Sequence, residues 1–240
     1  MRSFISEPFH IARAILSALA LLAAGQAVAA GIQQASFVEK ISRGVPQRVV
    51  LYGTSLTANG AWVQQLKDAV EAPYPGKVTW INSGGSGKAS DWGVANLRKK
   101  VIQQKPDTVF IEFSMNDAAT KLNVSRDQAR DNLAAMVKAI RTAHPDCEII
   151  LQIMNPVDRR ENDRFSPRPE LALYQQDYRD FAAGEGLLCV DHMPAFMALL
   201  EKGSDAYREF VPDGVHPNAE GFARYLTPTL LEAIGLSSGS

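Results

Sequence analysis

The chain has 240 residues and carries 25 Lys and Arg residues against 26 Asp and Glu residues, a formal net charge of −1. This balance argues against a protein that binds nucleic acid or an anionic membrane through a large basic surface. The length that follows a short N-terminal segment suits one domain with a substantial buried core.

The N-terminal segment has the features of a secretory signal peptide. An apolar run at residues 14–24 follows a basic start, and Ala-Val-Ala at residues 27–29 fits a small-x-small cleavage site. The run is too short to span a bilayer, and no later run approaches that length. We therefore predict a signal peptide over residues 1–29 and an exported domain over residues 30–240, periplasmic or secreted, without stable membrane insertion. The alternative for the first segment is a buried helix.

Short, continuous apolar runs alternate with helix-like segments along the rest of the chain. The predicted strands are residues 48–52, 78–81, 108–113, 148–154 and 187–190. The predicted helices are residues 61–72, 92–104, 125–142, 169–183 and 218–234. Strands that are apolar throughout are typical of sheets covered on both faces, and the alternation favours parallel pairing. We predict an α/β fold, a three-layer α/β/α sandwich with a five-stranded parallel sheet.

Two cysteines, Cys147 and Cys189, lie at or near the starts of predicted strands. In an exported protein they could form a disulfide if those strands are neighbours, although parallel neighbours need special geometry. The alternative is two buried free thiols. The cysteines and histidines show no spacing typical of a zinc site.

Ligands of parallel α/β sheets bind at the carboxyl ends of the strands, so the residues that follow each strand are the main functional candidates. At residues 49–57 an apolar, partly β-branched run stops at Gly-Thr-Ser, and a helix-like pattern begins soon after. Ser55 is a candidate nucleophile there, because a helix N-terminus favours a developing negative charge. Its alternative role is helix capping. Residues 158–170, rich in arginine, are expected to form an exposed loop near the same edge.

A serine nucleophile needs a histidine base and an acid that orients it. Of the four histidines, His10 lies in the predicted signal peptide and His144 at the end of a predicted helix. His216 follows Asp213 by three residues in a loop containing proline and glycine, where both side chains can turn the same way. His192 follows a strand and is the rival base. The alternative for the loop is an Asx turn with a helix cap.

Two further segments offer donors to an oxyanion. Gly-Ser-Gly at residues 85–87 follows the second predicted strand and offers backbone N–H groups in a glycine-rich turn. Asn116 follows the third predicted strand and offers a side-chain amide. Ordinary loop chemistry is the alternative for both segments.

Together these segments resemble the SGNH hydrolase superfamily, also called GDSL esterases and lipases. Gly-Thr-Ser-Leu is similar to its first block, with Thr54 where Asp is usual. Residues 82–87 are similar to its second block, and Ser-Met-Asn-Asp at residues 114–117 to its third, with Ser114 in place of Gly. Asp-Gly-Val-His at residues 213–216 is similar to its last block. The blocks occur in the superfamily's order over essentially the whole mature chain.

The resemblance implies a flavodoxin-like fold and ester hydrolysis by double displacement. In that mechanism Ser55 attacks the ester carbonyl, His216 takes its proton, and Asp213 orients the imidazole. The backbone N–H groups of Ser55 and Gly87 and the side chain of Asn116 would form the oxyanion hole. The mechanism needs no metal or cofactor.

Many exported members of the superfamily remove acetyl groups from polysaccharides, so the resemblance favours a short-acyl, small-molecule or polysaccharide ester as substrate. Trp62, Trp80 and Trp92 would suit stacking on sugars, and the alternative is that they pack in the core. The arginine-rich loop would suit an anionic polymer or a phospholipid head group. Other hypotheses are a periplasmic thioesterase or lysophospholipase, a catalytically silent carbohydrate-binding domain and a flavodoxin-like nucleotide binder. The sequence predicts no oligomeric state.

Overall fold

A five-stranded, entirely parallel sheet lies at the centre of the computed structural model, which describes residues 35–161 and 164–236. Its strands are β1 (Gln47–Gly53), β2 (Val78–Asn82), β3 (Thr108–Glu112), β4 (Glu148–Ile153) and β5 (Leu188–Asp191). They lie in the order β2-β1-β3-β4-β5, the order of flavodoxin-like sheets. The predicted strands are confirmed, with ends shifted by about one residue. The predicted signal peptide at residues 1–29 lies outside the described residues.

A hydrophobic core lies on each face of the sheet, which explains why the inner strands β1, β3 and β4 are largely apolar. On β1, Val49 and Leu51 point into one hydrophobic core, whereas Val50 and Tyr52 point into the other. All four side chains are fully buried. A strand with a core on each side has no solvent-facing row of residues, so it lacks the polar alternation of a half-exposed strand.

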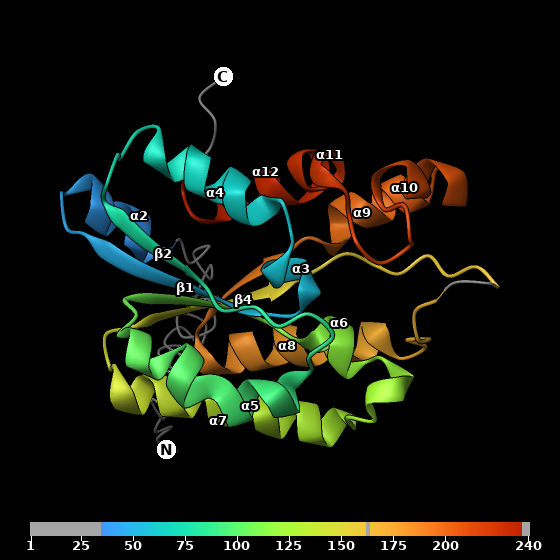
Figure 1. Cartoon of the computed structure of the whole chain (residues 1–240), viewed down its shortest axis with the longest axis horizontal. Helices are drawn as coiled ribbons and strands as arrows, with labels where there is room; N and C mark the ends of the chain where they lie inside the picture. The colour runs from blue at the N-terminus through green and yellow to red at the C-terminus, as the bar shows by residue number, and fades with distance from the viewer. Residues whose placement is uncertain (1–34, 162–163, 237–240) are drawn as a thin grey trace, which may run out of the picture. The chain divides into compact units, whose positions relative to one another are not determined.

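Helices cover the two faces in two layers (Figure 1). The layer over Val49 and Leu51 includes α2, α4, α9, α10 and α12, and the opposite layer includes α5, α7 and α8. The bounds are α2 (Ser36–Ser42), α4 (Trp62–Glu71), α5 (Ser90–Lys100), α7 (Arg126–Ala143), α8 (Leu171–Glu185), α9 (Met193–Leu200), α10 (Ser204–Phe210) and α12 (Thr227–Ala233). The predicted three-layer α/β/α sandwich is confirmed.

The longer helices follow the sequence pattern, and the shorter ones do not. In α7, Ser125 caps the N-terminus by accepting a hydrogen bond from the N–H of Gln128, as its place before the apolar repeat predicts. The pattern does not predict α2, α9 or α10, nor the single turns α3 (Ser55–Ala58) and α6 (Ser114–Asp117). Segments of four to eight residues contain too few turns to show a clear helical period.

The last predicted helix, at residues 218–234, is confirmed as a helical segment but is not a regular α-helix. Helical residues run without a gap through α11 (Ala219–Gly221), a π-helical turn (Phe222–Leu226) and α12. Pro228 accounts for the irregular turn, because proline has no N–H to donate to the carbonyl of Arg224 and its ring clashes with a regular turn there. The wider π-helical turn makes room for it.

Cys147 and Cys189 are free thiols, the second of the two alternatives that the sequence offers. Cys189 on β5 lies opposite Leu151 of β4, whereas Cys147 precedes the start of β4, so the strand register separates them. Burial raises the pKa of both thiols to about 12. They are therefore protonated and poorly nucleophilic at neutral pH.

The tryptophans pack within the domain, so they do not form a sugar-stacking surface together. Trp62 is fully buried, and its ring N–H donates to the carbonyl of Leu56 at 2.7 Å. Trp92 packs against Tyr52, with ring centroids 5.8 Å apart, and Trp80 packs against the core on the side of α4.

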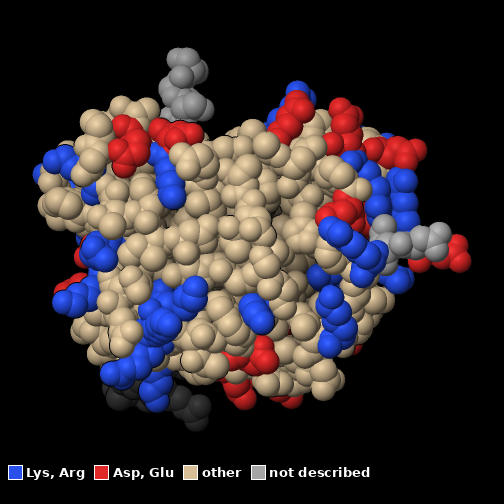
Figure 2. Space-filling model, in the orientation of Figure 1, with Lys and Arg blue, Asp and Glu red and all other residues tan. Residues whose placement is uncertain are grey.

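The surface carries charges of both signs. Figure 2 shows acidic and basic side chains interspersed around the rim of one face, with a largely uncharged centre. This distribution agrees with the net charge of −1. Within the described ranges, no helix has the length and apolar character to cross a membrane.

β1 ends at a glycine because a side chain there would overlap its neighbour on β3. Gly53 and Glu112 are partners in the register of the two strands. A Cβ on Gly53 would lie 2.6 Å from both the carboxyl carbon and the backbone carbonyl oxygen of Glu112. The missing side chain therefore leaves room for the buried Glu112 carboxyl group at the end of β1.

We expect Gly53→Ala to lower the free energy of unfolding by about 2 kcal/mol or more, because the added methyl group displaces the Glu112 carboxyl group. The matched control is Gly184→Ala in α8, where an added Cβ meets no atom within 4 Å. It should be neutral or stabilising by up to about 1 kcal/mol. Urea unfolding of both variants checks this, and a Gly53→Ala variant as stable as the wild type would contradict the overlap.

Candidate active site

The carboxyl edge of the sheet brings together all four segments that the sequence singles out. Ser55 begins α3 after β1, Gly87 lies in the turn after β2, and Asn116 lies in α6 after β3. Asp213 and His216 lie in the loop before α11. This is the edge at which parallel α/β sheets bind their ligands.

Ser55, His216 and Asp213 form a continuous chain of hydrogen bonds. The Ser55 Oγ lies 2.8 Å from the His216 Nε2, and the His216 Nδ1 lies 3.0 Å from the Asp213 Oδ2. The carboxylate can thus hold the proton on Nδ1, which leaves Nε2 free to accept the serine proton. The distances are those that a nucleophile–base–acid arrangement requires.

The Asp213 carboxylate is held by its own loop. Its Oδ1 accepts hydrogen bonds from the backbone N–H of His216 at 2.7 Å and of Val215 at 3.0 Å. Burial opposes ionisation of Asp213, but these bonds and the His216 ring outweigh it and lower its pKa below the usual value. The Asx turn that was the alternative to a catalytic role is therefore present, and it is what aims the carboxylate at the ring.

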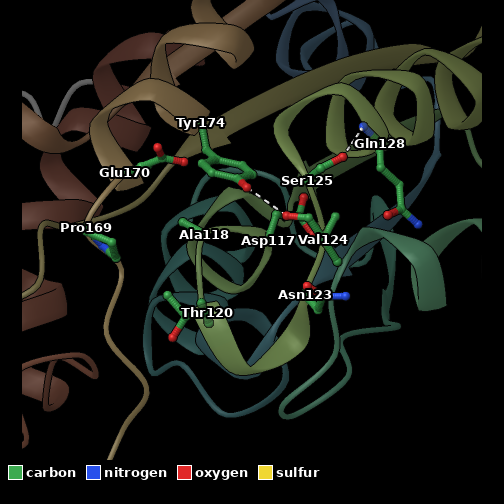
Figure 3. A pocket seen from close by; sticks show the side chains of 11 residues that line it. Asp117, Ala118, Thr120, Asn123, Val124, Ser125, Gln128, Pro169, Glu170 and Tyr174 are labelled. Atoms are coloured by element: carbon green, nitrogen blue, oxygen red, sulfur yellow. Dashed lines mark hydrogen bonds between the residues drawn. The ribbon is translucent and has the colours of Figure 1, made fainter.

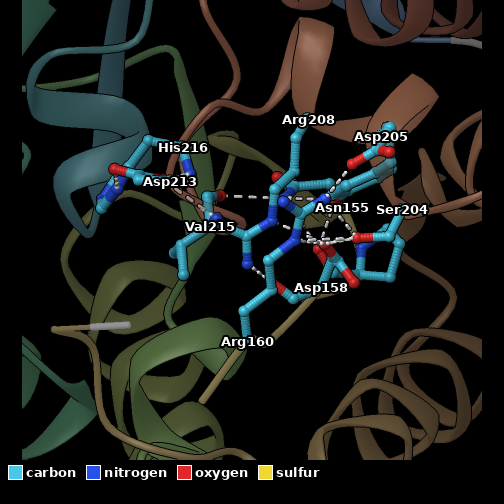
Figure 4. A network of polar contacts seen from close by, with 11 residues as sticks. Asn155, Asp158, Arg160, Ser204, Asp205, Arg208, Asp213, Val215 and His216 are labelled. Carbon is cyan, nitrogen blue, oxygen red and sulfur yellow. Dashed lines mark hydrogen bonds and ion pairs between the residues drawn. The ribbon is translucent and has the colours of Figure 1, made fainter. Parts of the chain in front are cut away.

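A polar network supports the loop of Asp213 and His216 from behind (Figure 4). The buried Asn155, which follows β4, donates to the carbonyl of Val215 at 2.9 Å. The N–H of Asp158 donates to the carbonyl of Gly214 at 3.0 Å. Gly214 has φ +76°, and a Cβ there would overlap the Asp158 carbonyl oxygen. The loop therefore rests directly on the backbone of the segment after β4.

Asp158 also joins this segment to α10. Its carboxylate accepts hydrogen bonds from the Arg208 Nε and the Ser204 Oγ, both at 2.6 Å. Asp158 and Arg208 are both largely buried, so their ion pair is screened little by solvent. The expectation that residues 158–170 form an exposed loop is confirmed only in part: Arg159, Arg160 and Arg164 are exposed, whereas Asp158 and Arg168 are half-buried and bonded to surrounding elements.

The turn that carries Ser55 is fixed by Glu112. Thr54 caps α3, because its Oγ1 accepts from the N–H of Leu56 at 3.2 Å. The buried Glu112 Oε1 accepts from the N–H of Thr54 at 2.6 Å, and from the hydroxyls of Thr54 at 3.0 Å and Thr57 at 2.7 Å. Burial nevertheless outweighs these bonds and raises the pKa of Glu112 to about 7.

Asn116 and the turn of Gly87 lie against each other. The Asn116 Nδ2 donates to the carbonyl of Lys88 at 2.9 Å, which uses one of its two N–H groups. Gly87 has φ +69°, a conformation that glycine adopts without strain. The turn is also tied to β1, because the N–H of Gly85 donates to the carbonyl of Gly53 at 2.8 Å.

His192 is not a second base at this site. It is fully buried, and its Nε2 lies 3.2 Å from the side-chain oxygen of Gln152. Burial lowers its pKa to about 3, so it is neutral at physiological pH. The structure places His216, and not His192, against Ser55.

A small cavity opens beside Ser55 and His216. Its volume is about 260 Å³, and its lining includes Leu56, Phe222 and the exposed Arg164. The Phe165 ring lies edge-on to the His216 ring, with centroids 5.0 Å apart. The segment after β4 therefore also contacts the imidazole of His216.

A larger pocket lies apart from this chemistry (Figure 3). Its volume is about 490 Å³, and polar side chains such as Glu170, Gln128 and Asn123 surround it together with Tyr174. It is lined by neither Ser55 nor His216. Its lining includes Asp117, whose Oδ1 accepts a hydrogen bond from the N–H of Ser90 at 2.7 Å.

In the parts of the chain that the structure describes, no three His, Cys, Asp or Glu side chains gather as a metal site would require.

Comparison with known proteins assigns the class. Residues 44–224 match the GDSL-like Lipase/Acylhydrolase family. The chain therefore belongs to this family, and it is a carboxylic ester hydrolase, as its resemblance to SGNH hydrolases predicts.

Relatives with assigned activities point the same way. An arylesterase from Vibrio mimicus is 28% identical over 183 residues, which cover 72% of this chain and 82% of the relative. Thioesterase 1/protease 1/lysophospholipase L1 from Escherichia coli K12 is 25% identical over 170 residues, covering 70% of this chain and 71% of the relative.

Solved structures share the fold. An acetylxylan esterase from Geobacillus stearothermophilus superposes with a TM-score of 0.69 at 22% identity, over 82% of this chain and 98% of that one. A lipase/acylhydrolase from Enterococcus faecalis gives a TM-score of 0.64 at 26% identity, over 79% and 93% of the two chains.

Three residues that shape the site are not identified from the sequence: Glu112, Asn155 and Arg168. The sequence does mark Glu112 as unusual, because it is a lone acidic residue at the end of an otherwise apolar strand and is therefore expected to be buried with polar partners. Asn155 lies after a strand, where polar residues are common, and its sequence context does not reveal its partner. Arg168 is one of several arginines in its segment, and nothing in the sequence separates it from the others.

The raised pKa of Glu112 predicts a pH-dependent stability. The folded state binds the Glu112 proton more tightly than the unfolded state, so this group favours folding at acidic pH, and its contribution is lost as the pH rises through about 7. We expect the free energy of unfolding of the wild type, relative to Glu112→Gln, to fall between about pH 5 and 8 by up to about 1.4 kcal/mol per pH unit. Denaturant unfolding of both proteins across this range measures the difference.

Other buried groups titrate in the same range but are present in both proteins. One is Asp117, whose pKa is raised by burial to about 7, and the other is His192. Their contributions to the pH dependence of the free energy of unfolding cancel when the two proteins are compared. A difference that stays constant with pH would show that Glu112 is ionised throughout.

Proposed function

We propose that this esterase cleaves short-acyl esters, with acetyl esters of carbohydrate as the favoured substrates, through a Ser55–His216–Asp213 triad. The observation that carries the catalytic part is the 2.8 Å contact between the Ser55 Oγ and the His216 Nε2, continued to Asp213 at 3.0 Å. We also propose that residues 1–29 direct export, as their basic, apolar and small-residue segments suggest.

Catalysis begins with attack of the Ser55 Oγ on the ester carbonyl carbon, while the His216 Nε2 takes the hydroxyl proton. The tetrahedral intermediate collapses when His216 returns that proton to the leaving alcohol, which leaves the acyl group on Ser55. Water, deprotonated by His216, then attacks the acyl-enzyme and releases the acid. Asp213 stabilises the imidazolium that forms in each half-reaction.

Three donors serve the oxyanion in this proposal. The Ser55 N–H lies in the first turn of α3, where helical N–H groups lack acceptors within their own helix. The Gly87 N–H comes from the turn after β2. The Asn116 side chain keeps one N–H beyond the one given to Lys88. Preorganised donors of this kind supply a large share of the barrier reduction in acyl transfer.

The cavity supports a short acyl group. Its 260 Å³ lies below the range of about 300–1,000 Å³ that holds drug-sized ligands, and Phe222 and Leu56 belong to its apolar lining. The acetylxylan esterase that shares this fold acts on acetyl esters of a polysaccharide, which makes carbohydrate the first choice for the alcohol. The Escherichia coli relative, named as a thioesterase and lysophospholipase, makes a thioester or lysophospholipid the second candidate.

We expect Ser55→Ala to lower kcat for p-nitrophenyl acetate by at least about 10³-fold while the thermal midpoint stays near that of the wild type. His216→Ala should have a similar effect on kcat. His192→Gln is the matched control, because His192 is buried away from Ser55 and should keep most of the activity of the folded fraction. Turnover that survives in Ser55→Ala, or that disappears only in His192→Gln, would overturn the triad.

The size of the cavity predicts a chain-length profile. With p-nitrophenyl esters from acetate to dodecanoate, kcat/KM should fall by about tenfold or more beyond butyrate, because longer chains meet Phe222 and Leu56. Phe222→Ala should extend the accepted chain. A maximum for the long-chain esters in the wild type would favour the lysophospholipid or thioester alternative.

A further inference from the structure

Arg168 lies between β4 and α8 and reaches the residue that we propose as the side-chain oxyanion donor. Its guanidinium donates to the carbonyl of Met115 at 2.7 Å, the carbonyl of Ser166 at 2.9 Å and the Oδ1 of Asn116 at 3.3 Å. The side chain is partly buried, and burial lowers its pKa from the usual arginine value, although guanidinium is still charged at neutral pH. It therefore acts as a donor only.

The two neighbours of the Asn116 amide define which way it faces. Arg168 has only donors, so the amide end that faces it must be the oxygen. The carbonyl of Lys88 is only an acceptor, so the end that faces it must be the nitrogen. A flipped amide would place donor against donor and acceptor against acceptor. The pair therefore fixes the second N–H of Asn116 in one direction.

The segment that carries Arg168 is anchored without the guanidinium. The N–H of Thr120 donates to the carbonyl of Pro167 at 3.0 Å, and the N–H of Lys121 donates to the Ser166 Oγ at 3.0 Å. The hydroxyls of Thr120 and Ser166 also lie 2.8 Å apart. Removing the Arg168 side chain thus leaves several ties between this segment and the one that follows α6.

We propose that Arg168 is a positioning residue for the oxyanion hole: it holds the Asn116 amide with an N–H directed at the developing oxyanion. The proposal rests on the role of Asn116 given above. A donor that is fixed before the reaction needs no reorganisation in the transition state, whereas one that rotates freely must be ordered there. The guanidinium bond also polarises the amide, which strengthens the N–H as a donor.

A double-mutant cycle tests the proposal, because it isolates the part of the Arg168 effect that passes through Asn116. We expect Asn116→Ala to lower kcat by about 10²–10³-fold. Arg168→Met keeps the aliphatic bulk and should lower kcat by about tenfold in the wild-type background, with KM within about twofold. In the Asn116→Ala background the same change should lower kcat by no more than about twofold, since the amide is already absent.

Two further variants test whether the loss of kcat depends on the geometry of the Arg168 guanidinium, and not on its charge or on a general loss of stability. Arg168→Lys keeps the charge but lacks the planar fork, so it should not recover more than a small part of the lost kcat. Arg179→Met, which removes the ion pair between α8 and Asp191, is the matched control and should leave kcat within about twofold. Circular dichroism and thermal midpoints confirm that each variant is folded.

The outcomes distinguish the two proposals. Equal losses from Arg168→Met in both backgrounds, or full activity in Arg168→Lys, would overturn the positioning role while leaving Asn116 as an oxyanion donor. An Asn116→Ala enzyme with wild-type kcat would instead overturn the oxyanion assignment itself.

Discussion

The active site depends on a buried carboxyl group, that of Glu112, at the end of the central strand β3. A carboxyl group in a dry interior is unfavourable unless hydrogen-bond donors surround it. Thr54 and Thr57 supply these donors, and both belong to the turn that carries Ser55. The need of the Glu112 side chain on β3 for hydrogen-bond donors thus determines the backbone conformation of the turn that follows β1. The position of Ser55 follows from the packing of the core as much as from the local turn.

The segments after β3 and β4 position the other side chains of the site. α6 after β3 carries Asn116, so the same strand positions both the nucleophile turn and the amide. The segment after β4 contacts the base loop through Asn155 and Asp158, and it contacts Asn116 through Arg168. One connection therefore contacts both the loop of His216 and the side chain of Asn116. This arrangement explains why a stretch rich in charge is partly buried.

Most of the fold and the proximity of Ser55, His216 and Asp213 are predictable from the sequence, and the supporting contacts are not. Continuous apolar runs reveal the five strands because most of their residues pack against a hydrophobic core on one face of the sheet or the other, and Asp213 with His216 is recognisable because a loop of four residues brings them together. The π-helical turn within the last helical segment depends on how the chain accommodates Pro228, which the apolar pattern does not report. Glu112 and Arg168 act across 55 residues or so, and a single sequence contains no measure of such distant contacts.

Two of the ties that hold the segment after β4 join main-chain groups only: the N–H of Asp158 to the Gly214 carbonyl, and the Pro167 carbonyl to the N–H of Thr120. Every residue type except proline offers the same main-chain donor and acceptor. Substitutions between these two ties therefore leave the ties themselves in place, whereas an insertion or deletion near either tie would shift Arg164, which lines the cavity beside Ser55. In divergence or directed evolution, this stretch is a place where the lining of that cavity can change by substitution while the backbone at both ends keeps its position.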